Sequence, residues 1–331
     1  MEFLSEPTIV VALIEVAIGL ALLTKAADLF VDGAVAIAGA AKISPLVVGA
    51  VIVGFGTSAP ELLVSGLAAV NGDVDLGVGN IVGSNVANLS LVLGAAALVV
   101  PLLVTKAVTA KEAPISLFAV LLFAFFTLNG FEVWEGIAML VVLVAILAWI
   151  VLGGNEDSVE ELVFDPEQTM SKSLGETFLG LLGTLIGAQL MVWGASAIAA
   201  EFGLTGGFVG FTLVAIGTSL PELVTAVAAA KKGEAELILG NLLGSNVFNS
   251  LAVGGVIAVV GAGEIDDELM RTYGIAIMVF VAVLAWVFMV GRKRISKPEA
   301  VALLTVYVSA IVLISETDVG EAIRDAIESI A

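Results

Sequence analysis

Residues 56–62 read GTSAPEL and residues 217–223 read GTSLPEL, an offset of 161 positions. A second pair of segments, GNIVGSNVAN at 79–88 and GNLLGSNVFN at 240–249, repeats at the same offset of 161. Two motifs that recur with one spacing, and with no gap between them, indicate an internal duplication rather than chance. The chain is therefore predicted to consist of two related halves.

The hydrophobicity of the chain indicates that both halves lie in a membrane. Hydrophobic residues make up 60% of the sequence, and the mean hydropathy is +1.13, whereas soluble domains contain roughly 45–50% apolar residues. The apolar residues form runs close to the length of about 20 residues that crosses a bilayer. We predict an all-α polytopic membrane protein with ten transmembrane helices, near residues 8–31, 45–70, 76–104, 113–129, 132–152, 175–200, 205–230, 237–262, 270–291 and 299–316.

The basic residues predict the orientation of these spans. Ten of the 13 lysines and arginines lie in loops that follow odd-numbered spans, whereas the opposite side has only Arg271 and Arg324, and Lys25 lies within the first span. Positively charged loops stay in the cytoplasm. Both termini are therefore predicted to be extracellular, in a multi-pass protein of the plasma membrane.

Each half contains five predicted spans, and this odd number would place the second copy upside down in the membrane. The predicted organisation is a first five-helix repeat at 1–152, an acidic cytoplasmic linker at 153–174, a second inverted five-helix repeat at 175–316, and a short C-terminal tail at 317–331. Inverted repeats are common in secondary transporters, whose binding sites lie near the membrane midplane where the repeats meet.

Glu61 and Glu222 are the strongest candidates for function. Each lies near the middle of an apolar predicted span, where an ionised carboxylate costs several kcal/mol unless it is paired or hydrated. Lys25 is the one basic residue clearly inside a span, and it cannot neutralise both carboxylates. A bound cation can. Protonated or structurally paired glutamates remain the alternative interpretation.

The residues around the two glutamates are suited to a cation. Pro60 and Pro221 lack an N–H group and should break their helices, which would free nearby carbonyl groups to face a ligand. Hydroxyl and amide side chains recur four residues apart, a spacing that places them on one helix face: Thr57 with Glu61, Thr218 with Glu222, Ser84 with Asn88, and Ser245 with Asn249. Such hard oxygen ligands suit Ca²⁺ and Na⁺. Hydrogen bonding between helices is the alternative role for the asparagines.

The composition excludes several other classes of site. The chain has no cysteine and no histidine, so it has no thiolate metal site, no disulfide and no imidazole to carry protons. A net charge of −19 gives no reason to expect a nucleic-acid partner. We expect no enzymatic activity and no cofactor, and the expected partners are the transported ions and the lipid bilayer.

The two motifs, GTSxPE followed by GNxxGSN, resemble the two α-repeats of the calcium/cation antiporter superfamily, and most closely those of prokaryotic sodium/calcium exchangers. The resemblance covers nearly the whole chain. It implies antiport of Na⁺ against Ca²⁺ by alternating access, with the first and sixth spans sliding across the core. It places Ca²⁺ between Glu61 and Glu222 with oxygens from Thr57 and Thr218, and Na⁺ at adjacent sites formed by Gly54, Ser58, Ser84, Asn88, Ala215, Ser219, Ser245 and Asn249.

Asn249 is one departure from part of this superfamily, because some relatives, including potassium-dependent exchangers, have an aspartate there. The asparagine argues against K⁺ cotransport. A proton/Ca²⁺ antiporter on the same scaffold is the nearest alternative function, and a cation channel is a more distant one. The absence of histidine disfavours an intramembrane hydrolase that would use the paired acids. We expect the protein to function as a monomer.

Overall fold

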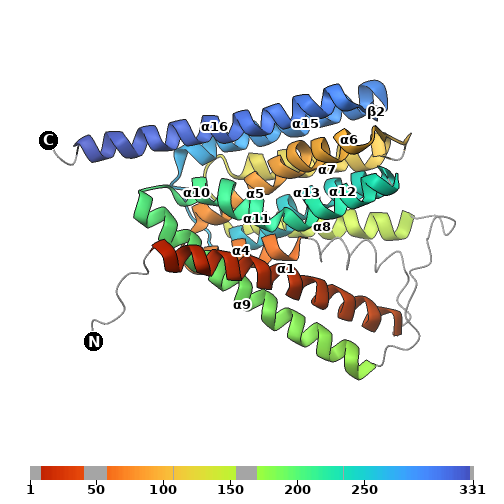
Figure 1. Cartoon of the computed structure of the whole chain (residues 1–331), viewed down its shortest axis with the longest axis horizontal. Helices are drawn as coiled ribbons and strands as arrows, with labels where there is room; N and C mark the ends of the chain where they lie inside the picture. The colour runs from red at the N-terminus through yellow and green to blue at the C-terminus, as the bar shows by residue number, and fades with distance from the viewer. Residues whose placement is uncertain (1–8, 41–57, 107, 154–169, 234, 329–331) are drawn as a thin grey trace.

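The computed structural model describes residues 9–40, 58–106, 108–153, 170–233 and 235–328, and these residues are almost entirely helical (Figure 1). The first half contains α1 (Ile9–Ala40), α4 (Ala59–Val70), α5 (Val74–Ala87), the π-helix η2 (Asn88–Val92), α6 (Leu93–Val99), β1 (Leu102–Leu103), the π-helix η3 (Val108–Glu112), α7 (Ala113–Phe126) and α8 (Val133–Gly153).

The second half follows the same order with further interruptions. It contains α9 (Met170–Phe202), α10 (Gly206–Val209), the π-helix η5 (Gly210–Val214), α11 (Ala215–Thr218), α12 (Leu220–Lys232), α13 (Ala235–Phe248), the π-helix η6 (Asn249–Val253), α14 (Gly254–Val260), the π-helix η7 (Met270–Gly274), α15 (Ile275–Arg292), β2 (Arg294–Ile295) and α16 (Lys297–Glu328).

The helices of the two halves begin at matching positions. Five pairs start 161 residues apart, the offset of the repeated motifs: α1 and α9, α4 and α12, α5 and α13, η2 and η6, and α6 and α14. Even the change from α-helix to π-helix recurs, at Asn88 and again at Asn249. The duplicated sequence therefore folds into duplicated local structure over these elements.

The helices are long and apolar enough for a membrane protein. Seven segments of the described chain qualify as spans by length and composition: Ile9–Ala26, Val74–Val99, Val108–Asn129, Met170–Phe202, Ile238–Val260, Met270–Arg292 and Lys297–Ser315. Three shorter apolar helices, Ala59–Val70, Val133–Trp149 and Gly206–Thr218, lie where the sequence predicts the other crossings. Residues 45–57 of the predicted second span lie outside the described residues.

Several helices are longer than the predicted spans. α1 continues to Ala40 instead of ending near 31, α9 begins at Met170 inside the predicted linker, and α16 continues to Glu328 through most of the predicted tail. Hydropathy marks the part of a helix that lies in lipid, whereas backbone hydrogen bonding continues into polar sequence beyond it. Residues 154–169 of the predicted linker lie outside the described residues.

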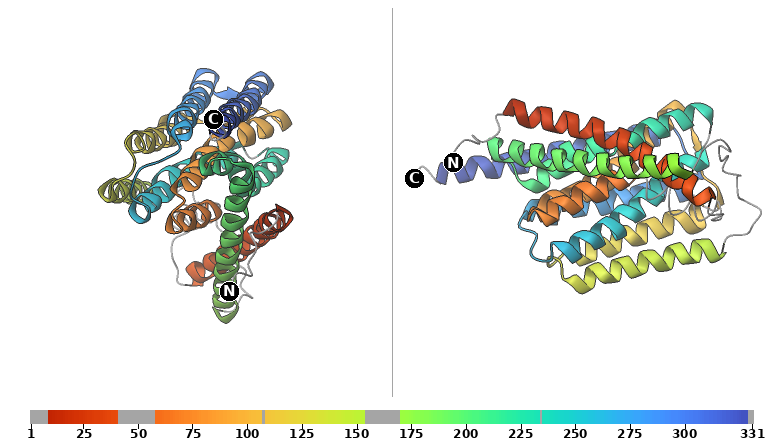
Figure 2. Two further views of the ribbon diagram at one scale, coloured as in Figure 1. Left: turned by 90° about the vertical axis from the view of Figure 1, so that its left-hand side faces the viewer. Right: turned by 90° about the horizontal axis from the view of Figure 1, so that it is seen from below.

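α1 and α9 form a pair at one edge of the molecule, apart from the main bundle (Figures 1 and 2). A Cβ atom on Gly19 would lie 2.8 Å from the Gly187 carbonyl oxygen, and one on Gly194 would lie 2.6 Å from the Ala12 carbonyl oxygen. Residue numbers rise along α1 as they fall along α9, so the helices run antiparallel. Glycine allows their backbones this close approach, as it does between membrane helices generally.

α5 and α13 occupy the centre of the bundle. Within the segment Val74–Val99, 83% of the residues in the most apolar window are buried, and within Ile238–Val260 the value is 78%, against 28% for Ile9–Ala26. Glycine also sets the packing here, because a Cβ atom on Gly83 would lie 2.6 Å from the Ala215 Cβ. The repeated GNxxGSN motif therefore lies in the most enclosed part of the protein.

A short antiparallel ribbon joins the two halves at one end of the bundle. Leu102 of β1 pairs with Ile295 of β2, and Leu103 pairs with Arg294. Next to it, the Arg292 guanidinium donates a hydrogen bond of 2.8 Å to Glu299, whose carboxylate also accepts from Ser296. This ribbon holds the start of α16 close to the end of α6.

Candidate cation site

Both glutamates lie in the first turn of a helix that begins with a serine and a proline. Ser58 precedes α4 with φ −95° and ψ 6°, and Ser219 precedes α12 with φ −88° and ψ 3°. Neither conformation is helical. The Leu62 N–H donates to the Ser58 carbonyl at 3.0 Å, and the Leu223 N–H donates to the Ser219 carbonyl at 3.1 Å.

The break in the second half therefore falls at Ser219, two residues before Pro221, which confirms the predicted interruption there. It also corrects the prediction that Thr218 and Glu222 share one face of a continuous helix, because the helix is interrupted between them. The corresponding residues before Ser58 lie outside the described part of the chain, and these include the candidates Gly54 and Thr57.

The two carboxylates are buried and mostly unpaired. Glu61 and Glu222 are each 1% exposed. Ser219 donates a long hydrogen bond of 3.5 Å to Glu61 Oε1, while Glu61 Oε2 and both oxygens of Glu222 have no hydrogen-bond partner. The charges of Glu61 and Glu222 are close enough to repel each other. Unpaired buried carboxylates cost several kcal/mol per ion in their charged form.

No basic residue neutralises these acids within the part of the chain that the structure describes. The ion pairs found there join Lys172 with Glu176 and Arg292 with Glu299. Lys25, the one basic residue predicted inside a span, is exposed on α1. A cation from solution would supply the missing positive charge.

Hydroxyl groups from both halves surround Glu61. The Thr218 hydroxyl donates to Asn80 Oδ1 at 3.2 Å and lies 3.5 Å from the Ser84 hydroxyl. Asn80 is held in turn by the hydrogen bond from its amide nitrogen to Ser65, at 2.8 Å. Because Thr218 donates its proton to Asn80, the lone pairs of its oxygen are left to face a ligand. Thr218 and Ser219 therefore meet the glutamate of the opposite half.

Asn88 and Asn249 lie at matching places, where α5 and α13 change into the π-helices η2 and η6, and both are fully buried. The Asn88 amide nitrogen donates to Asn246 Oδ1 at 3.1 Å, which leaves Asn88 Oδ1 unpaired. Neither polar atom of the Asn249 amide has a partner. Single π-turns inside helices occur frequently at functional sites.

Ser58, Ser84 and Ser245 are also buried, with exposures of 3%, 0% and 1%. The Ser58 hydroxyl has no hydrogen-bond partner. The Ala215 carbonyl, in contrast, already accepts hydrogen bonds from the Ser219 N–H at 3.0 Å and from the Thr218 hydroxyl at 3.4 Å. Since a carbonyl has two lone pairs, Thr218 would have to release this bond before Ala215 could bind an ion.

Asparagines that the sequence analysis did not single out connect the two halves. Asn85 donates to Ser250 at 3.0 Å, and Asn246 donates to the Asn85 carbonyl at 3.3 Å. Asn80, Asn85 and Asn246 all lie within the repeated GNxxGSN motif, so their recurrence was the available signal. Their hydrogen bonds position the helices on which the other candidates lie.

The unpaired buried oxygens converge on one centre. Each buried polar atom without a partner calls for an explanation, because proteins satisfy nearly all of them. In the described residues, no group of three or more acidic, histidine or cysteine side chains could hold a metal ion. The ligands offered here are instead two carboxylates with hydroxyl and amide oxygens, a set suited to hard cations such as Ca²⁺ and Na⁺.

A family model described as sodium/calcium exchanger protein matches residues 11–152 and 172–315. The chain belongs to the sodium/calcium exchanger family. It is 37% identical over 308 residues to the putative antiporter CaxA of Alkalimonas amylolytica, covering 90% of this chain and 97% of that protein. It is 28% identical over 338 residues to the sodium/calcium exchanger MaX1 of Methanosarcina acetivorans, covering 90% of this chain and 96% of that one.

The fold of this exchanger-family protein also matches solved structures. The sodium-calcium exchanger NCX_Mj soaked with 2.5 mM Na⁺ and 0.1 mM Ca²⁺ aligns with a TM-score of 0.64 and 32% identity, over 91% of this chain and 97% of that one. The same exchanger soaked with 100 mM Na⁺ and 10 mM Sr²⁺ gives a TM-score of 0.65. The predicted resemblance is thereby confirmed, and the protein is a multi-pass membrane protein of a cation-antiporter fold.

Proposed function

We propose that the protein exchanges Na⁺ for Ca²⁺ across the plasma membrane by alternating access, with the ions bound near the membrane midplane. The observation that carries this proposal is the set of unpaired buried oxygens around Glu61 and Glu222. Membership of a family of sodium/calcium exchangers supports the choice of ions. A transporter of this kind needs no catalytic residue and no cofactor, since Na⁺ and Ca²⁺ are its substrates.

The proposed architecture is ten transmembrane helices in two inverted five-helix repeats, at 1–152 and 175–316, with both termini outside and the linker between them in the cytoplasm. The antiparallel contact of α1 with α9 supports the inversion, and so does the shared offset of 161 residues between helix starts. In Figure 1 the first turn of α1 and the last turn of α16 lie at the same end of the molecule, as an even number of crossings requires. The functional unit is proposed to be a monomer.

Within this site, Ca²⁺ is proposed to bind between Glu61 and Glu222 with oxygens from Thr57 and Thr218. The Na⁺ sites are proposed to use oxygens of Gly54, Ser58, Ser84 and Asn88 in one half and of Ala215, Ser219, Ser245 and Asn249 in the other. The hydrogen bond from Ser219 to Glu61 supports ligand sets drawn from both halves. The free carbonyl oxygen of Asn88 supports its role as a ligand.

Coupling follows from charge in this mechanism. One Ca²⁺ or more than one Na⁺ compensates two buried carboxylates, whereas the empty site leaves them unpaired at a cost of several kcal/mol. The helices would therefore change sides mainly when loaded. α1 and α9 are proposed to move as the sliding pair, since their closest contacts are with each other.

Uptake of radiolabelled Ca²⁺ into Na⁺-loaded proteoliposomes, diluted into Na⁺-free buffer, tests this function. The wild-type protein should accumulate Ca²⁺, and Glu61→Gln and Glu222→Gln should not. Glu201→Gln, which removes an exposed carboxylate at the end of α9, is the matched control and should transport normally. Uptake that persists in both site variants would refute the proposed role of the glutamates.

A proton/Ca²⁺ antiporter is the second candidate, because protons can also neutralise buried carboxylates that have no basic partner. A pH gradient imposed across Na⁺-free vesicles distinguishes the two. Ca²⁺ uptake driven by that gradient, and not by a Na⁺ gradient, would keep the site and change the coupling ion.

A further inference from the structure

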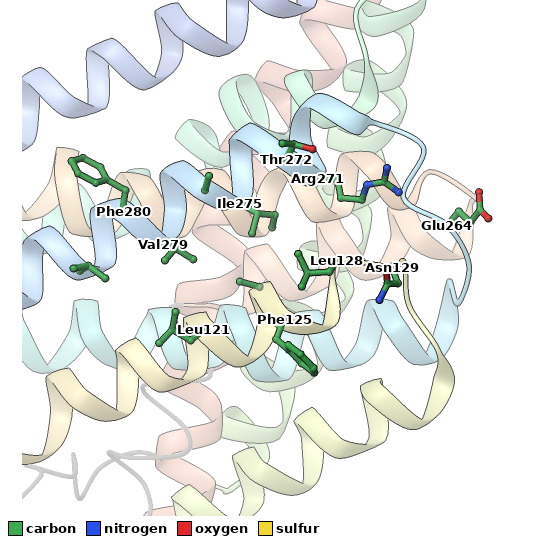
Figure 3. A pocket seen from close by; sticks show the side chains of 13 residues that line it. Leu121, Phe125, Leu128, Asn129, Glu264, Arg271, Thr272, Ile275, Val279 and Phe280 are labelled. Atoms are coloured by element: carbon green, nitrogen blue, oxygen red, sulfur yellow. The ribbon is translucent and has the colours of Figure 1, made fainter.

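An apolar groove of about 1150 Å³ lies between α7 and α15, away from the cation site. Its walls are Leu121, Phe125 and Leu128 on one side and Ile275, Val279 and Phe280 on the other (Figure 3). Phe125 is 65% exposed and Phe280 is 56% exposed. Both helices belong to membrane spans, so this groove faces lipid.

The polar residues of the groove gather at one end. Arg271, Thr272, Asn129 and Glu264 lie together beyond Leu128, whereas the rest of the lining is hydrocarbon (Figure 3). A molecule that matches this lining has a polar head and a long apolar tail. From Arg271 to Val283 the helix advances about 18 Å, close to the roughly 15 Å of hydrocarbon in one leaflet.

The charges at the polar end are not used within the protein. Arg271 is half-buried, and its guanidinium makes no ion pair or hydrogen bond with any described residue. Glu264 beside it is exposed and likewise forms no ion pair in that part of the chain. An arginine fork binds phosphate oxygens in two-pronged fashion, and a carboxylate binds an ammonium group.

We propose that this groove binds one aminophospholipid of the leaflet that contains Arg271, the outer leaflet by the positive-inside rule. Its acyl chain lies along Phe125 and Phe280, its phosphate binds Arg271, and its primary ammonium binds Glu264. Exposed carboxylates at Asp266 and Glu268 stand near the same end. They favour a headgroup that carries its own positive charge over one that is purely anionic.

Native mass spectrometry of the purified full chain tests this proposal. The protein would be offered equal amounts of phosphatidylethanolamine, phosphatidylcholine and phosphatidylglycerol with identical acyl chains. We expect one phosphatidylethanolamine to be retained preferentially. Arg271→Gln should lower its retention about fivefold, the effect of one basic residue near a membrane surface, whereas Arg294→Gln, which removes an exposed arginine elsewhere, should not.

Two further variants separate the groove from the headgroup. Ala276→Trp fills the groove from an exposed position, and Val287→Trp is its control on the same helix outside the lining. Ala276→Trp should abolish retention, and Glu264→Gln should shift preference from phosphatidylethanolamine to phosphatidylglycerol. Equal retention of all three lipids by the wild-type protein would overturn the proposal. Unchanged retention in Arg271→Gln, or a dimer that covers Ala276, would overturn it as well.

Discussion

The central helices α5 and α13 and the peripheral pair α1 and α9 are held in different ways. Side-chain hydrogen bonds cross between the halves in the centre, as from Asn88 to Asn246 at 3.1 Å and from Asn85 to Ser250 at 3.0 Å. At the edge, glycines such as Gly19 and Gly187 bring two backbones together without such cross-links. Directional bonds fix one arrangement, whereas smooth close packing tolerates sliding along its length.

This contrast predicts that substitutions in the two regions have different consequences. Changes in the centre should alter stability and ion binding. Changes in the α1–α9 contact should alter the rate of transport and leave the binding site intact.

The largest effect is expected when a central carboxylate is removed. Ca²⁺ at a hundred times its Kd should stabilise the wild-type protein by about 2.7 kcal/mol, and Glu222→Gln should lose this stabilisation. Without Ca²⁺ the variant should be at least as stable as wild type, because a neutral amide costs less to bury than an unpaired carboxylate. Thermal unfolding in detergent, with and without Ca²⁺, measures both, and a Ca²⁺-dependent rise in Tm that survives in Glu222→Gln would contradict the site.

A smaller effect is expected when a cross-link between the halves is removed. Asn246→Leu leaves the Asn88 amide nitrogen without its acceptor, and a buried unsatisfied donor costs about 1–3 kcal/mol. Asn249→Leu removes a side chain that makes no hydrogen bond, so it should lose less stability while weakening Na⁺ binding. Chemical unfolding of the two variants side by side checks this order, and equal losses would argue against it.

At the edge, Gly19→Ala should slow transport several-fold while leaving the Ca²⁺-dependent rise in Tm unchanged. The added methyl group would lie 2.8 Å from the Gly187 carbonyl oxygen and would force α1 away from α9. Gly175→Ala is the control, because no described atom lies within 4 Å of the Cβ it adds. A loss of Ca²⁺ stabilisation in Gly19→Ala would show that the edge and the centre are not separable.

The smallest effect is expected on the exposed face of the edge pair. Lys172 and Glu176 are four residues apart on α9, with 3.7 Å between their charged atoms, and the lysine side chain is 64% exposed. Exposed pairs of this kind contribute less than about 0.5 kcal/mol. Lys172→Gln should therefore unfold within about 0.5 kcal/mol of wild type, and a larger shift would reveal a structural role for this end of α9.

The positions of the helices were readable from the sequence because a membrane protein must satisfy its backbone within long apolar runs. The repeated motif likewise identified Glu61, Ser84, Asn88 and their counterparts, since polar residues in apolar spans are rare. Helix ends were less predictable, because hydropathy says nothing of a helix beyond the bilayer. Ala40 and Glu328 illustrate this limit.

The partners of the polar residues could not be derived in the same way. Periodicity along one helix pairs Thr218 with Glu222, whereas the structure brings Thr218 to Asn80 of the other half. That contact depends on how two helices cross, which no local pattern encodes. The π-helices at Asn88 and Asn249 were also unforeseen, because one extra residue in a turn leaves the apolar pattern almost unchanged.

Those π-turns affect which insertions and deletions the chain can tolerate. Each adds one residue to a helical turn, and one residue of an α-helix corresponds to about 100° of rotation. Deleting a single residue between Asn88 and Val92 would restore a regular helix and keep the upstream motif in place. Every side chain of α6 would then face a different direction, so the wide turn acts as a rotational spacer between the ligand-bearing and lipid-facing parts of one rod.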